Sequence, residues 1–216
     1  MPVPAELITR LERALSGADD TAARATRLLE DARRLCGRVR HLVSAGLIPA
    51  DVDAAPMEVC CFALQLPLKP SRATAGKPGR ATLKERTEQA AEMLVGVAGD
   101  LGGVDGLLDE TTRLLADVHH KRPASEPARV LADALNLEDF GVSGVMVQAM
   151  TLARQGQGVL AVADGLEKRE QYGYWDARLK DGFHFDVSRQ IARKRLEAAR
   201  KVAGMLVGEL KEDRAV

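Results

Sequence analysis

The sequence predicts an all-α protein, and three observations support this prediction. Alanine, leucine, arginine and glutamate dominate the 216 residues, and all four are strong helix formers. Only 3% of the residues are aromatic. Valine and isoleucine stand at isolated positions instead of the alternating runs that are typical of strands. We therefore expect a compact bundle of eight to ten helices.

Apolar periodicity and helix-breaking residues place these helices along the chain. Regularly spaced leucines mark the first helix, and a long apolar stripe that stops before Gly46 marks the second. Pro56 suits the start of a third helix, which is apolar nearly all round and should therefore be buried centrally. The expected helices span residues 7–15, 28–42, 57–66, 82–98, 105–120, 128–137, 145–154, 159–179 and 186–211.

Capping residues support the later helices. Thr82 with Glu85 has the spacing of a capping box. Asp105 and Asp186 are expected to cap the helices that follow them, and Ser125 opens the helix between these two. Glycines separate the helical segments beyond residue 140.

Length and charge restrict the classes of protein. The chain suits one domain, and we expect residues 1–20 to form a helical arm and residues 21–212 the all-α domain. Lys and Arg number 31, as do Asp and Glu, and this balance argues against a protein that coats nucleic acid. No apolar run approaches 18 residues, so no membrane span is expected. Three cysteines, an odd number, indicate reduced thiols and a cytoplasmic location.

Three features indicate a candidate site. Asp133 lies in an apolar helical segment, where a buried carboxylate needs a partner. Two simpler interpretations are an Asp133 that faces water or one that pairs with Arg129, four residues earlier. His41 lies late in an amphipathic helix, and His119 and His120 end the helix upstream of Asp133.

The segment around Asp133 resembles a known family. Residues 129–138 read RVLADALNLE, and residues 140–145 read FGVSGV. Together they are similar to the late segment of the HD superfamily of metal-dependent phosphohydrolases. Residues 178–181 and 191–193, with Met205, Leu206 and Leu210, resemble the closing helices of its small single-domain bacterial members. The resemblance covers roughly residues 30–212 and implies the HD-type all-α fold.

The resemblance also implies a metal site. In the family, a metal is held by one His, by an adjacent His-Asp pair and by a distant Asp. The first His matches His41 and the last Asp matches Asp133, while some members add ligands near His119 or His120. At the positions of the pair this chain has Gln65 and Leu66. Leu66 cannot bind a metal, and Gln65 offers only a neutral carbonyl oxygen.

The missing pair decides between the functional interpretations. If each ligand contributes about 3–4 kcal/mol, loss of two weakens metal binding on the order of ten-thousandfold or more. The leading hypothesis is a non-hydrolytic binding or regulatory module without a cofactor, which keeps a vestigial pocket between His41, Gln65 and Asp133. The alternative is an active phosphohydrolase on a nucleotide or another small phosphate ester. Its Mn²⁺, Co²⁺, Mg²⁺ or iron ion would be held by His41, Asp133 and His119 or His120. A third possibility is that the resemblance reflects common helical packing alone.

A basic segment follows the missing pair. Pro67 to Gly79 contains three prolines and two glycines, which predict a surface loop. Its neighbourhood carries four cations and no acid, and we expect either a solvated loop or a site for the phosphate of a small ligand or nucleotide. The candidate phosphate-binding residues are Lys69, Arg72, Lys77 and Arg80.

Overall fold

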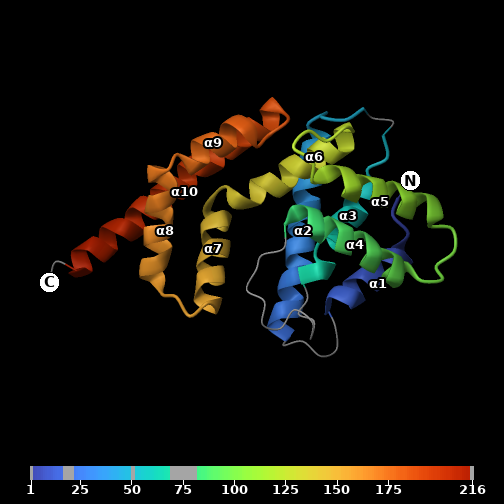
Figure 1. Ribbon diagram of the computed structural model, residues 1–216, viewed down its shortest axis with the longest axis horizontal. Helices are drawn as coiled ribbons and strands as arrows, with labels where there is room; N and C mark the ends of the chain where they lie inside the picture. Colours follow the sequence, from blue (N-terminus) through green and yellow to red (C-terminus); the bar gives the residue numbers. More distant parts are fainter. Residues whose placement is uncertain (1, 17–21, 50–51, 69–81, 215–216) are drawn as a thin grey trace. The chain divides into compact units, whose positions relative to one another are not determined.

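The computed structural model describes residues 2–16, 22–49, 52–68 and 82–214, and Figure 1 shows that most of these residues lie in helices. The predicted all-α class is confirmed, and the ten α-helices of the described part agree with the expected number. In chain order the elements are α1 (Ala5–Ser16), α2 (Ala22–Ser44), α3 (Ala55–Ala63), η1 (Leu66–Leu68), α4 (Leu83–Ala98), α5 (Asp105–Val118), α6 (Glu126–Asn136), η2 (Leu137–Asp139), α7 (Val142–Arg154), α8 (Val159–Gln171), α9 (Tyr174–Asp181) and α10 (Asp186–Arg214).

The chain divides into two compact units, Met1–Ala132 and Asp133–Val216. Helix α1 packs against α2 and α4 inside the first unit. Its three leucines, Leu7, Leu11 and Leu15, are fully buried. The expected boundary after residue 20 therefore differs from this division, because the leucine face of α1 belongs to the core of the first unit.

Helix α3 is the centre of the first unit, as its composition predicts. It contacts α1, α2, α4 and α5, and all of its residues except Glu58 are buried. The carboxylate of Glu58 accepts two hydrogen bonds from the guanidinium of Arg40 on α2, at 2.7 and 3.0 Å. The three cysteines are free and buried, and burial raises the pKa of the Cys60 thiol far above its ordinary value.

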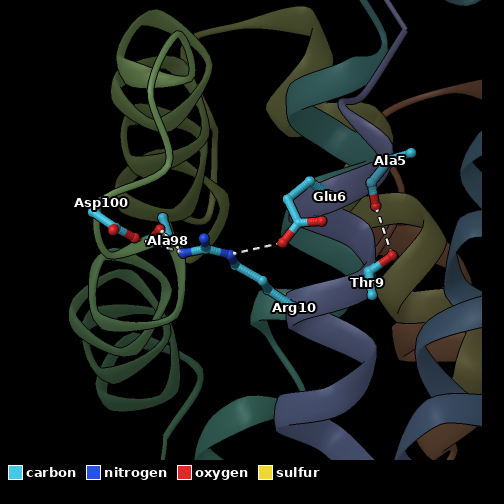
Figure 2. A network of polar contacts seen from close by, with 6 residues as sticks. All are labelled: Ala5, Glu6, Thr9, Arg10, Ala98 and Asp100. Atoms are coloured by element: carbon cyan, nitrogen blue, oxygen red, sulfur yellow. Dashed lines mark hydrogen bonds and ion pairs between the residues drawn. The ribbon is translucent and has the colours of Figure 1, made fainter.

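A single arginine joins α1 to the end of α4 (Figure 2). The Nη1 atom of Arg10 donates to the Ala98 carbonyl oxygen at 2.8 Å and to Asp100 Oδ1 at 3.2 Å. Its Nε atom donates to Glu6, one turn earlier on α1, at 3.2 Å. Because Ala98 is the last residue of α4, this contact satisfies a carbonyl that lies at the helix end.

The caps differ in how well the sequence predicts them. The capping box is confirmed, because Thr82 Oγ1 accepts the Glu85 N–H while Glu85 Oε2 accepts the Thr82 N–H. The expected Asp105 cap is wrong. Asp105 is the first residue of α5, and the N-cap position is Val104, which makes no side-chain capping bond. Acidic residues are common both at the N-cap and in the first turn of a helix, so the residue type alone did not distinguish the two positions.

The second unit packs α7, α8 and α10 together around Val145, Val162, Leu166 and Ala199. The expected helical segment 159–179 is interrupted. It is divided into α8 and α9 at Gly173, which has a left-handed backbone with φ of 60°. Glycine adopts this conformation without the steric cost that a side chain imposes, and so it ends α8 and redirects the chain.

Candidate functional site

Asp133 lies near the end of α6 and is fully buried. Its two carboxylate oxygens accept backbone N–H groups from the segment before α10. Oδ1 accepts from His184 at 2.8 Å, and Oδ2 accepts from Phe185 at 3.1 Å. Burial raises the pKa of the Asp133 carboxyl, and the two N–H donors oppose this rise because they favour the charged form.

The two simpler interpretations of Asp133 are wrong. The side chain does not face water, since its exposed fraction is zero. Arg129 donates elsewhere, from Nε to the Pro123 carbonyl oxygen at 2.8 Å. The expectation that this carboxylate needs a partner is correct, but the partners are backbone groups about 50 residues further along the chain. No side-chain pattern in the sequence identifies such donors.

A second polar cluster of this unit lies beyond Asp133 and was missed in the sequence. Arg178 of α9 donates from Nη2 to Asn136 Oδ1 at 2.7 Å and to Asp139 Oδ2 at 3.2 Å. The Tyr174 hydroxyl donates to the same Asp139 oxygen at 3.3 Å, and Asn136 Nδ2 donates to the Gly182 carbonyl oxygen. These bonds join the end of α6 to α9. The available signal was the spacing of Tyr174 and Arg178, which places both on one face of a helix.

The residues at the positions of the family's His-Asp pair follow α3 in the first unit. Gln65 has an exposed fraction of 2% and Leu66 of 1%. The Gln65 Nε2 atom makes no hydrogen bond within the described part of the chain. A buried amide without a partner is costly, and in native proteins such a group calls for an explanation.

Arginines surround a half-buried carboxylate in this unit. Asp31 of α2 is 3.5 Å from Arg27 and 3.5 Å from Arg34, which lie one turn to either side. Burial raises the pKa of the Asp31 carboxyl, while Arg34, Arg38 and Arg86 oppose the rise through their charges. This cluster was also missed in the sequence. Its signal is the spacing 27, 31, 34 and 38, which marks one face of α2.

The candidate histidines lie at two helix ends of the first unit. His41 is exposed in the last turn of α2. His119 caps the end of α5, and its Nδ1 atom lies 3.5 Å from the Thr87 hydroxyl of α4. His120 is exposed, with its ring centroid 4.2 Å from that of His119. Of the two adjacent histidines, His119 is therefore the one that contacts the interior.

The described residues contain no group of three His, Cys, Asp or Glu side chains placed to hold a metal ion. The predicted basic residues Lys69, Arg72, Lys77 and Arg80 lie outside the described residues. Among the helices that the structure describes, none combines the length and hydrophobicity of a membrane-spanning segment. Chemically, the buried Gln65 amide offers a hydrogen-bond donor.

Comparison with known proteins does not identify a relative. No family model, no curated protein and no solved structure matches this chain. The functional conclusion therefore depends on the residues and their geometry.

Proposed function

We propose that this chain is a non-hydrolytic binding or regulatory module built on an HD-type helical scaffold. The observation that carries the proposal is the bonding of Asp133. Both of its carboxylate oxygens accept backbone N–H groups, from His184 and Phe185. A carboxylate held in this way stabilises the connection into α10, which accounts for its burial without a metal ion.

Gln65 and Leu66, which follow the C-cap of α3, support the same conclusion. Leu66 has no atom that can bind a metal, and it is buried as an ordinary core residue. Gln65 can supply one neutral oxygen, which is a weaker ligand for a divalent ion than the imidazole and carboxylate that the family uses. Two of four metal ligands are thereby absent from the scaffold that the resemblance implies.

The proposed ligand is a small phosphorylated molecule or a nucleotide that is held without turnover. The resemblance to metal-dependent phosphohydrolases, whose substrates are phosphate esters, supports such a ligand. A reducing cytoplasm is the proposed compartment, where buried thiols such as Cys36, Cys60 and Cys61 persist.

The proposal is tested on the purified full-length chain by metal analysis and by turnover of a chromogenic phosphate ester with Mn²⁺, Co²⁺ or Mg²⁺. We expect less than stoichiometric metal and no turnover above that of an Asp164→Ala variant, which changes an exposed acid of α8. Stoichiometric metal together with turnover that is lost in both His41→Ala and Asp133→Asn would overturn the proposal and establish the hydrolase. Circular dichroism of each variant separates a loss of activity from a loss of folding.

A further inference from the structure

One face of the C-terminal half of α10 carries an exposed apolar side chain between charges of opposite sign. Met205 is 67% exposed, although the other side of the helix packs against α8 through Ala203 and Leu206. A cation lies about one turn before Met205, and acids lie about one and two turns after it. The residues of this face, called the outer face of α10 below, are all exposed and are Lys201, Gly204, Met205, Gly208, Glu209 and Glu212.

The charges of the outer face are not paired within the described part of the chain. The ion pairs from this half of α10 to α8 are made by other residues, Arg200 and Lys211. Lys201 and Glu212 are eleven positions apart in one helix. This separation is roughly 16 Å along the helix axis, so the two charges of one copy cannot pair with each other. Both are therefore accessible to a partner.

The outer face is complementary to itself when two copies of α10 run antiparallel. A two-fold axis through the middle of the face places Lys201 of one copy opposite Glu212 of the other. It also places Met205 of one copy opposite Gly208 of the other, so that a long side chain faces a position without one. Glu209, one turn before Glu212, adds a second acid near the same lysine. A parallel pair would place each charge opposite its own copy, and the charges therefore select the antiparallel pair.

The surface around Met205 has room for a second helix. A Cβ atom built on Gly204 or on Gly208 would have nothing within 4 Å. A groove of about 450 Å³ between α8 and α10 reaches the outer face at Gly204, and its apolar lining includes Leu166 and Val207. A second copy of α10 on the outer face would lie beside this groove and shield apolar surface from water.

We propose that the outer face of α10 is a homodimer interface, in which two copies of the chain pair antiparallel through residues 201–212. The matching of cation with acid and of methionine with glycine under one two-fold axis identifies the occupant as a second copy. We expect a reversible dimer with a micromolar Kd, because one helix pair buries less surface than the interface of an obligate dimer. The interface is independent of the proposed function, since none of its residues belongs to the candidate site.

The first test is sedimentation equilibrium of the full-length chain at concentrations from about 1 to 300 μM and at low ionic strength. We expect the average mass to rise from that of the monomer towards that of the dimer across this range. Added salt should weaken the dimer, because it screens the charges that face each other. A chain that stays monomeric at the highest concentration would overturn the interface.

Two charge reversals test the antiparallel arrangement. Lys201→Glu places acids opposite acids, and Glu212→Lys places lysines opposite lysines, so each variant alone should dimerise about tenfold more weakly than the parent. A mixture of equal amounts of the two variants should form a mixed dimer, because each reversed charge then meets its opposite. Recovery in the mixture also shows that both variants are folded. Variants that stay as weak when mixed as they are alone would overturn the proposed pairing.

Met205→Gln tests the apolar contact. We expect dimer affinity to fall several-fold, because glutamine retains the length of the side chain but not its apolar end. Met146→Gln is the matched control, since Met146 of α7 is also exposed, at 54%. Lys180→Glu, at an exposed position of α9, is the control for a reversed charge. Both controls should leave the affinity within about twofold of the parent. Losses as large as those of the outer-face variants would overturn the assignment of the interface to α10.

Discussion

Asp133 Oδ1 accepts the backbone N–H of His184 at 2.8 Å, although the two residues are 51 positions apart in the chain. The bond joins the end of α6 to the segment that begins α10, inside the second unit. Neither a metal nor a basic side chain is needed to explain why this carboxylate is buried. The first two predictions test that relationship.

Removal of the carboxylate should destabilise the protein strongly. Asp133→Ala leaves the N–H groups of His184 and Phe185 without acceptors, and we expect the free energy of unfolding to fall by about 3 kcal/mol. Urea denaturation followed by circular dichroism measures this change. Asp164→Ala, at an exposed position of α8, should change stability by less than about 0.5 kcal/mol. Equal effects of the two substitutions would exclude the structural role of Asp133.

The same carboxyl should make stability depend on pH. Burial raises its pKa in the folded protein above the ordinary value of 3.8, so the unfolded chain loses this proton first as the pH rises. The part of its stabilisation that comes from the raised pKa is therefore fully present below pH 3.8 and is lost as the pH rises through the folded pKa, while the two N–H bonds of the carboxylate remain. Asp133→Asn does not titrate. The unfolding free energy of the parent minus that of this variant should fall across this window, as urea denaturation at a series of pH values would measure. A flat difference would contradict the raised pKa.

Glycine is required where α7 approaches η2. A Cβ atom built on Gly144 would lie 2.7 Å from the carbonyl carbon of Asp139 and would clash with the carbonyl oxygen as well. The backbone cannot move aside cheaply, and Gly144→Ala should cost about 2 kcal/mol. At Gly208 of α10, nothing lies within 4 Å of the position that a methyl group would take, so Gly208→Ala should stabilise by about 0.5–1 kcal/mol. Thermal unfolding should give a lower melting temperature for Gly144→Ala and a higher one for Gly208→Ala than for the parent.

The capping box should behave as a coupled pair. Thr82→Ala removes the acceptor of the Glu85 N–H and should cost about 1 kcal/mol. Glu85→Ala removes the reciprocal bond, so a double variant should lose less than the sum of the two single losses. A double-variant cycle from urea denaturation measures the coupling. Strict additivity would show that the two bonds act independently.

Local features of the chain were predictable because they depend on neighbours in the sequence. The Thr82–Glu85 cap needs only a spacing of three residues, and the burial of α3 needs only an apolar surface on every side. The interruption at Gly173 was not predicted, because a glycine within a helix is tolerated unless its backbone takes a left-handed conformation. The placement of Asp105 failed for a similar reason, since caps and first turns favour the same residue types.

The long-range contacts of the candidate site could not be predicted from the sequence. By itself, the sequence determined the helical class, the core faces of the helices and the need of Asp133 for a partner. Only the tertiary structure decided that the partners of Asp133 are the backbone N–H groups of His184 and Phe185, and that Arg86 of α4 acts through its charge on Asp31 of α2. Periodicity records which residues share a helix face. Contacts between elements depend on how the helices pack in three dimensions. Every residue except proline carries a backbone N–H group, so the sequence does not show which of these groups will bind a given side chain.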